Sequence, residues 1–531
     1  AKKGEKVVNM NLAAVDAGIN SPVKVEVPAS WSQVKDERTV DESLPDVVKN
    51  IVIPCNRQRG DDLPVSALVP YQDGTYPMGT SKYDKRGIAA SLPTWDSTKC
   101  LQCNQCTFVC PHAAIRAYLV NEEEAKNAPT GFTMVDAKNA AGLKYRLQVS
   151  TLDCTGCGSC AESCLAKDKA LTMQPADDTM YDETNWNYAL SLSDKPNVFD
   201  RKTLKGSQFA QPLVEFSGAC AGCGETPYAK LLTQLYGEKM YWVNGVGCST
   251  AWAGAFPSLA YAKNKEGRGP SYYATLFEDQ AENGMGMVLA VKQRRNYVKL
   301  QAEALLELTD SAEVKAAIEA WLASFEDLDK NDGDARALTA VLEKTAFTGE
   351  AATAAENILK NKDQLSKKVV WLFGGDGWAY DIGYGGLDHV MASNEDINVF
   401  VVDTEVYSNT GGQSSKATPI GASAKFADGG KRTAKKELGR LLMNYPNTYV
   451  ASVAMGANPG QLMKAVTEAV AHKGPSIVIA YAPCINHGIK AGMGKAQAEM
   501  KKAVDCGLWP LYRYNPDKKE KPFSLDYKQP T

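Results

Sequence analysis

Histidine is scarce in this chain: the 531 residues contain four, namely His112, His389, His472 and His487. This scarcity argues against zinc sites and against acid–base chemistry built on imidazole. The formal net charge is −3, so the chain lacks the basic excess of proteins that bind nucleic acid or a membrane surface. No apolar run reaches the ~18 residues of a transmembrane helix. The sequence begins with Ala1 rather than Met, and its first residues lack the apolar core of a secretory signal.

Cysteine, in contrast, is concentrated in two matching runs. Each run has the spacing Cys-x2-Cys-x2-Cys-x3-Cys, which is the ligand spacing of [4Fe–4S] clusters in bacterial ferredoxins. In two-cluster ferredoxins the fourth cysteine of each run ligates the other cluster. Zinc sites use separate pairs, often with His, and disulfide frameworks suit short secreted chains. We therefore predict two [4Fe–4S] clusters and a reducing compartment, the cytoplasm, with the ligands Cys100, Cys103, Cys106, Cys110, Cys154, Cys157, Cys160 and Cys164.

Composition divides the chain into three predicted domains. Residues 1–85 are rich in Pro, Asp and Lys, show few periodic segments and predict an irregular connector. Residues 86–205 contain the two cysteine runs, which form an internal repeat and predict a ferredoxin-like domain. Residues 206–531 alternate short apolar strands with helix-like segments, which predicts a parallel α/β domain. The predicted fold class is therefore multidomain, with an α+β cluster domain followed by an α/β domain.

Four apolar, β-branched segments support the prediction of a parallel sheet: 367–373, 398–402, 449–453 and 475–480. Within the same domain, the segment from about residue 290 to residue 366 is rich in Ala, Glu, Lys and Leu. It predicts an insertion of two or three helices, broken at the polar turn 331–334, with no chemistry of its own.

A glycine-rich turn follows the first of these strands. It places Asp376 between Gly375 and Gly377, with Trp378 next. Glycine lets a backbone approach a ligand closely, and an Asp in such a turn can hold Mg²⁺, which shares oxygen ligands with phosphates. An ordinary Asp-Gly turn explains the same residues when they are taken alone.

The next predicted strand ends in a polar loop, Asp403 to Gln413. Its distance from Asp376, about thirty residues, fits a strand–helix–strand crossover that brings two loops side by side. Together the two loops resemble the signature of thiamine diphosphate-dependent enzymes, with Thr404 where most of that superfamily has Asn. The basic stretch from Lys425 to Lys436 is expected to be a solvated surface, with phosphates of coenzyme A as the alternative contact.

Four more cysteines are scattered through the predicted α/β domain, residues 206–531. Four thiolates from loops of one α/β domain can hold a third cluster. A redox or zinc pair together with two buried cysteines explains the spacing equally well. The four residues are Cys220, Cys223, Cys248 and Cys484, and the remaining Cys55 and Cys506 are expected to be free thiols.

These segments together resemble the C-terminal portion of pyruvate:ferredoxin oxidoreductase. The resemblance covers essentially the whole chain and is carried by residues 82–87 (KYDKRG), 220–228 (CAGCGETPY), 276–284 (LFEDQAENG), 374–383 (GGDGWAYDIG) and 403–415 (DTEVYSNTGGQSS). It implies that the four scattered cysteines ligate a third [4Fe–4S] cluster beside thiamine diphosphate. It also implies Mg²⁺ ligation by Asp376, Thr404 and the carbonyl of Val406.

The resemblance further implies which residues contact thiamine diphosphate and substrate. Glu225 and Asn409 are the implied catalytic residues, Asn409 because it matches a position near the substrate. The implied cofactor contacts are Glu225, Cys248, Gly375, Asp376, Gly377, Trp378, Thr404, Glu405, Val406, Tyr407, Ser408 and Asn409.

The activity implied by the resemblance is oxidative decarboxylation of pyruvate with coenzyme A to acetyl-CoA and CO₂. Electrons would pass through three clusters to ferredoxin or flavodoxin. The N-terminal portion of the same enzyme is the implied partner, because it supplies a carboxylate that activates thiamine, and the full polypeptide is expected to be a homodimer. Another 2-oxoacid as substrate, a polyferredoxin-type carrier and a non-redox thiamine decarboxylase remain alternatives.

Overall fold

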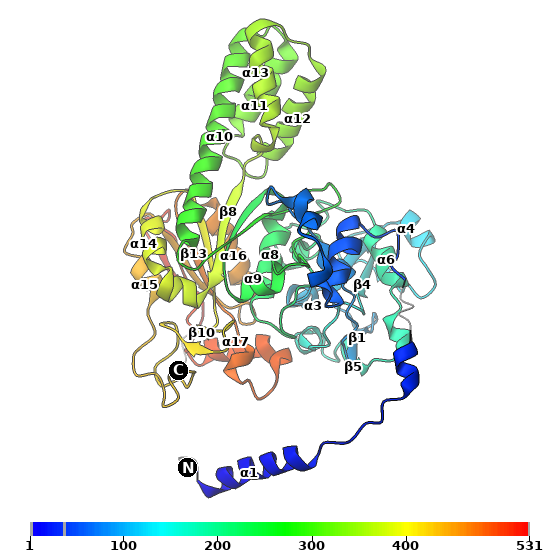
Figure 1. The fold of residues 1–531 in the computed structure, drawn as a ribbon. Coiled ribbons are helices and arrows are strands. Elements are labelled where there is room, and N and C mark those ends of the chain that lie inside the picture. The colour runs from blue at the N-terminus through cyan, green and yellow to red at the C-terminus, as the bar shows by residue number, and fades with distance from the viewer. Residues whose placement is uncertain (1–3, 35–38, 529–531) are drawn as a thin grey trace. The chain divides into compact units, whose positions relative to one another are not determined.

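The computed structural model describes residues 4–34 and 39–528 (Figure 1). The chain forms two compact units, residues 1–60 and 61–531. The first contains helix α1 (Glu5–Asn20) and the short helix α2 (Ile53–Asn56). The prediction of an irregular segment is thus wrong for residues 5–20, which form four turns of helix with no buried side chain.

The cysteine runs lie in a small α+β region. Strand β1 (Ser91–Trp95) pairs antiparallel with β5 (Leu171–Pro175), and β2 (Ile115–Val120) pairs with β4 (Lys144–Val149), which also pairs with β3 (Val135–Asp136). Helices α3 (Gln105–Phe108) and α5 (Ser159–Glu162) begin at equivalent positions of the two runs. The internal repeat predicted from the cysteine spacing is therefore present in the backbone. Helices α4 (Glu122–Lys126), α6 (Thr184–Ser191) and α7 (Leu204–Ser207) complete this region.

An eight-stranded sheet forms the core of the larger part of the chain, in the order β15-β14-β12-β13-β9-β8-β6-β7. The six strands from β12 to β7 in that order run parallel, and β14 and β15 form an antiparallel edge. The bounds are β6 Met240–Gly245, β7 Ser271–Thr275, β8 Val369–Gly375, β9 Asn398–Asp403, β12 Tyr449–Val453, β13 Ser476–Tyr481, β14 Tyr512–Tyr514 and β15 Phe523–Leu525. All four strands predicted from apolar runs are present, as β8, β9, β12 and β13. Their side chains are almost completely buried, as expected of a parallel sheet covered on both faces.

Helices flank this sheet and connect its strands (Figure 1). They are α8 Thr226–Tyr236, α9 Cys248–Ala253, α14 Tyr384–Ala392, α15 Leu438–Leu442, α16 Pro459–Ala471 and α17 Ala496–Asp505. Within the described ranges, no helix combines the length and apolarity that a membrane span requires.

The helical insertion is larger than predicted. It consists of four helices, α10 (Gln280–Leu308), α11 (Ala312–Ala323), α12 (Asn331–Lys344) and α13 (Gly349–Lys360), which pack around a core of their own. In Figure 1 they extend away from the sheet at the outer part of α10. The polar residues 331–334 do not break a helix as predicted but form the first turn of α12, where acidic side chains favour the helix dipole.

Candidate functional site

The cysteines of the two runs gather into two rings, each lining its own small cavity. The first ring contains Cys100, Cys103 and Cys106 from the first run, with Cys164 from the second. The second ring contains the remaining four, Cys110, Cys154, Cys157 and Cys160. The fourth cysteine of each run therefore joins the other run's ring, which is the crossed arrangement of two-cluster ferredoxins.

The backbone around the rings is shaped to donate hydrogen bonds to sulfur. The amides of Gln102, Gly156 and Ala170 donate to the Sγ atoms of Cys100, Cys154 and Cys164 at 3.3–3.4 Å. Such bonds stabilise thiolate ligands and help set cluster potentials. Gln102 and its repeat equivalent Gly156 both adopt positive φ, 57° and 67°, which turns each amide back toward the preceding sulfur.

The rings fit cubane clusters better than single metal ions. All fourteen cysteines have free thiols. Among the residues that the structure describes, no three His, Cys, Asp or Glu side chains converge on a single-ion position. A cubane instead takes one thiolate per iron, so its ligands stand apart around a cavity. Burial raises the pKa of Cys154 to about 12, and a buried thiolate of this kind needs metal to be stable.

The four scattered cysteines come together from three loops. The charges of Cys484 and Cys220 help raise the pKa of Cys248, so these residues lie near it. The charge of Cys248 in turn helps raise the pKa of Cys223. Burial is the main cause and brings the pKa of Cys248 to about 12 and that of Cys484 to about 11. Backbone amides donate to two of these sulfurs, Glu225 to Cys223 at 3.4 Å and Asn486 to Cys484 at 3.5 Å.

One loop separates this third set of cysteines from the second ring. A side chain on Gly222, between Cys220 and Cys223, would meet the carbonyl of Met493 at 2.6 Å. A side chain on Gly494 would meet the carbonyl of Cys157 at 2.3 Å. Only glycines allow this close backbone approach, and it brings the third set next to the dicluster region.

The carboxyl ends of β8 and β9 form a buried oxygen cradle. Thr404 donates to Asp376 Oδ1 from its amide at 3.1 Å and from its hydroxyl at 2.9 Å, and the same hydroxyl lies 3.0 Å from the carbonyl of Val406. Adjacent oxygens around Mg²⁺ at a metal–oxygen distance of 2.0–2.1 Å are about 3 Å apart. The donor set therefore fits Mg²⁺. Burial and the charge of Asp403 raise the pKa of Asp376 to about 8 in the absence of a cation.

Several residues that the sequence interpretation missed complete this cradle. Ser415 donates to Asp376 Oδ2 at 2.7 Å. The fully buried Asp403 accepts from Tyr380 and from Lys435, both at 2.7 Å. The expectation of a solvated basic surface is wrong for Lys435, because its ammonium pairs with Asp403 and also lies 3.4 Å from Glu405. No local sequence signal links these residues, which are 23 to 39 positions apart.

The predicted cofactor contacts differ in their exposure. Trp378 is fully buried in the π-helical turn Gly377–Ile382, and its indole ring fills the space beside Gly374 and Gly383. Gly375 and Gly377 flank Asp376, and a side chain on Gly377 would clash with the Tyr407 ring. Ser408 is half-buried and Asn409 is exposed, so the loop's tip is open to a ligand.

Glu225 lies close to the third set of cysteines, because its charge helps raise the pKa of Cys223, Cys248 and Cys484. It precedes α8, is 5% exposed and accepts from the Trp252 indole at 2.9 Å. Burial raises its pKa to about 7, and the bond from Trp252 opposes this rise. A carboxyl of this kind can hold or release a proton near neutral pH.

The loop 404–409 lies directly against the third set. The Sγ of Cys248 is 3.3 Å from the Ser408 hydroxyl, and Asn486 donates to the Ser408 carbonyl at 3.0 Å. His487, three residues after Cys484, contacts the Thr404 carbonyl at 2.6 Å. The structure thus joins the two groups of predicted site residues into one continuous region.

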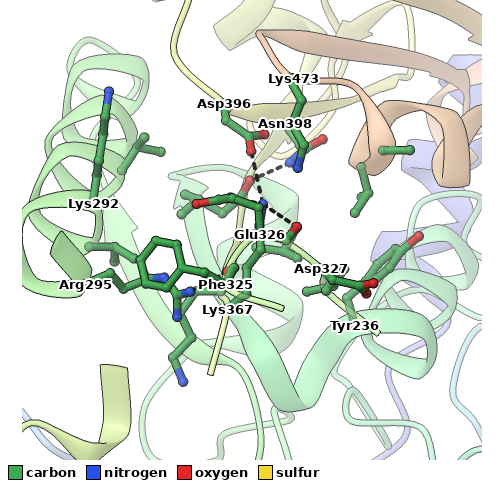
Figure 2. A pocket seen from close by; sticks show the side chains of 18 of the residues that line it. Tyr236, Lys292, Arg295, Phe325, Glu326, Asp327, Lys367, Asp396, Asn398 and Lys473 are labelled. Carbon is green, nitrogen blue, oxygen red and sulfur yellow. Dashed lines mark hydrogen bonds and ion pairs between the residues drawn. The ribbon is translucent and has the colours of Figure 1, made fainter. Parts of the chain in front are cut away.

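A cavity of about 950 Å³ lies elsewhere, where β8 and β9 begin (Figure 2). Its wall includes Lys367, which pairs with Glu326 at 2.7 Å and with Asp396 at 3.7 Å. Lys473 and Asn398 are also part of the wall. This cavity is at the opposite end of the strands from Asp376, and none of the predicted site residues lines it.

Three family models match parts of the chain. A thiamine pyrophosphate enzyme C-terminal TPP-binding domain matches residues 313–480, and a 4Fe-4S dicluster domain matches residues 92–173. A domain of unknown function named EKR matches residues 33–89. The first two confirm the predicted classes of cofactor, thiamine diphosphate and iron–sulfur clusters, and both support the predicted fold class.

The chain also resembles curated proteins over its whole length. It is 53% identical over 540 residues to the pyruvate:ferredoxin oxidoreductase of Moorella thermoacetica, covering 100% of this chain and 46% of that protein. It is 50% identical to the pyruvate-flavodoxin oxidoreductase of Enterobacter agglomerans, covering 99% and 45%. It is 44% identical to a mitochondrial NADP(+) pyruvate dehydrogenase of Euglena gracilis, covering 99% and 29%. The chain spans less than half the length of these relatives.

Proposed function

Because the chain belongs to the family of pyruvate:ferredoxin and pyruvate-flavodoxin oxidoreductases, we propose that it is the cofactor-carrying part of such an enzyme. In this proposal it holds thiamine diphosphate, Mg²⁺ and three [4Fe–4S] clusters. The reaction is oxidation of pyruvate with coenzyme A to acetyl-CoA and CO₂. The electrons pass to ferredoxin or flavodoxin.

The observation that carries this proposal is the contact between the 404–409 loop and the third set of cysteines. A thiamine-dependent decarboxylase needs no redox group beside its cofactor, and an electron carrier needs no oxygen cradle at the end of a sheet. Here Cys248 and Cys484 lie on loops that touch Ser408 and Thr404 directly. Contact between the two sites favours an oxidoreductase over both alternatives.

Bound thiamine diphosphate supplies the chemistry that decarboxylates a 2-oxoacid, and the clusters accept electrons one at a time. The chain's own residues would position these groups. Asp376, Thr404 and the Val406 carbonyl would hold the Mg²⁺ that neutralises the diphosphate. Glu225, whose pKa burial raises to about 7, would exchange a proton with the cofactor. The tight packing at Gly222 and Gly494 would keep the route to the second ring short.

The decisive experiment is Cys484→Ala in the complete enzyme, assayed without oxygen. We expect iron to fall by about four atoms per chain, pyruvate-dependent reduction of ferredoxin to be lost, and thiamine diphosphate still to bind. Cys506→Ala is the matched control, because Cys506 is exposed and belongs to none of the three sets. Reduction of ferredoxin at the parent rate by the Cys484→Ala enzyme would contradict the proposed third cluster.

Substrate, partner and location are parts of the same proposal. Comparing kcat/KM for pyruvate with that for 2-oxoglutarate and branched 2-oxoacids would separate pyruvate from the alternative substrates. The proposed partner is the N-terminal portion of the same enzyme, and the proposed assembly is a homodimer of the full polypeptide, testable by analytical ultracentrifugation. Thiolate-ligated clusters suit a reducing cytoplasm.

A further inference from the structure

Lys230 is a buried cation without a carboxylate partner. It lies in the middle of α8 and is 2% exposed. Its ammonium donates to the backbone carbonyl of Thr107. Among the described residues no Asp or Glu forms an ion pair with it, although an uncompensated buried charge is costly. The nearby Arg116, in contrast, is paired with Glu215.

The position of this ammonium relates it to both cysteine rings. Thr107 follows Cys106 of the first ring, and its carbonyl also accepts from the amide of Cys110, which belongs to the second ring, at 3.3 Å. The Lys230 ammonium therefore binds at a turn of chain that connects the two rings. Cys110 and Cys106 are the groups whose negative charge favours the protonated form of Lys230, while burial lowers its pKa to about 8.

The repeat shows that this arrangement is not required by the cluster fold. The carbonyl equivalent to that of Thr107 belongs to Ala161, which accepts from the amide of Cys164 at 3.2 Å. On that side the neighbouring cation is Lys169, which donates to the carbonyls of Glu162 and Cys164 but is exposed. Solvent screens the charge of Lys169, whereas protein surrounds that of Lys230.

We propose that Lys230 sets the reduction potentials of the two dicluster clusters, as the buried counter-charge to the electrons they receive. Each reduction adds one electron to a cluster, no bond forms or breaks, and Lys230 is neither oxidised nor reduced. Two unit charges about 10 Å apart at an effective dielectric of about 20 change an equilibrium constant by about tenfold. A tenfold change for a one-electron couple corresponds to 59 mV.

The test is Lys230→Met in the holoenzyme, followed by EPR during a mediated redox titration. We expect at least one of the two clusters to become about tenfold harder to reduce, a midpoint about 59 mV more negative. Iron content and circular dichroism should match the parent. The inference rests on the clusters of the proposed function, but the titration uses a chemical reductant and no pyruvate, so its result does not depend on the proposed reaction.

Two further variants separate charge from packing. Lys230→Arg keeps the charge, so the equilibrium constant for reduction of each cluster should stay within about threefold of the parent value. Lys169→Met removes an exposed cation that also donates to backbone carbonyls. It should change the equilibrium constant for cluster reduction by less than about threefold. An unchanged potential in Lys230→Met, or an equal shift in Lys169→Met, would overturn the proposal.

Loss of clusters in a variant is also informative. If Lys230→Met fails to retain iron while Lys230→Arg retains it, the charge is needed to stabilise the anionic clusters, which supports the proposal. If both variants lose iron, the shape of the lysine rather than its charge is required, and the proposal is wrong.

Discussion

The crossed arrangement of the two cysteine rings can be tested by pairs of substitutions. Cys100→Ala with Cys164→Ala removes residues from different runs but from the same ring. Cys100→Ala with Cys110→Ala removes residues from the same run but from different rings. The two double variants remove the same number of thiolates, so they differ only in how those thiolates are distributed between clusters.

The expected magnitudes follow from four irons per cluster. With three clusters, the parent contains about twelve iron atoms per chain. The pair from one ring should lower this to about eight, because one cluster is lost. The pair from two rings should lower the iron content to about four atoms, because both rings then lack a ligand.

Anaerobic measurement of iron and acid-labile sulfide checks this prediction, and EPR of the reduced protein counts the remaining dicluster signals. Cys55→Ala is a suitable control, since Cys55 belongs to none of the three sets. The opposite order, with more iron lost from the Cys100/Cys164 pair than from the Cys100/Cys110 pair, would show that each run ligates its own cluster and would refute the crossed arrangement.

Three other predictions concern packing and charge. Gly377→Ala places a side chain 2.4 Å from the Tyr407 ring, so calorimetry should show thiamine diphosphate binding weakened by at least about tenfold. Lys368→Met should increase the free energy of unfolding at pH 7 by about 1–2 kcal/mol and therefore raise the melting temperature. Burial lowers the pKa of Lys368 to about 8, so the gain should be full below pH 8 and disappear as pH rises toward 10.5. Glu215→Gln leaves the buried Arg116 unpaired and should cost about 3–5 kcal/mol in denaturant unfolding.

Each of these has a matched control and a contradicting result. Gly385→Ala adds a side chain where no atom lies within 4 Å, and equal loss of binding there would remove the argument for Gly377. Lys464→Met, at an exposed position, should leave the melting temperature unchanged at every pH. Arg116→Met combined with Glu215→Gln should recover part of the lost stability, and failure to do so would mean that the charge is not the cause.

The sequence by itself determined the features that depend on residues close together in the chain. Regular spacing within each run predicted the cluster ligands, because three thiolates on one tight loop can serve one cubane, and the structure gathers these cysteines into two rings. Near-continuous apolar runs identified β8, β9, β12 and β13, because strands buried on both faces tolerate few polar side chains. The same local logic missed α1, none of whose side chains is buried, and misread the first turn of α12 as a break.

The tertiary structure decided which distant residues meet. Ser415 reaches Asp376 across 39 positions and Lys230 reaches Thr107 across 123, and neither contact leaves a periodic signal. Lys435 belongs to a stretch that composition alone marks as solvent-exposed, yet Asp403 at the end of β9 draws its ammonium into the cradle. The spacing of residues in the sequence restricts only which ligands one short loop can supply. The partners of a buried charge depend on how loops from different strands pack together.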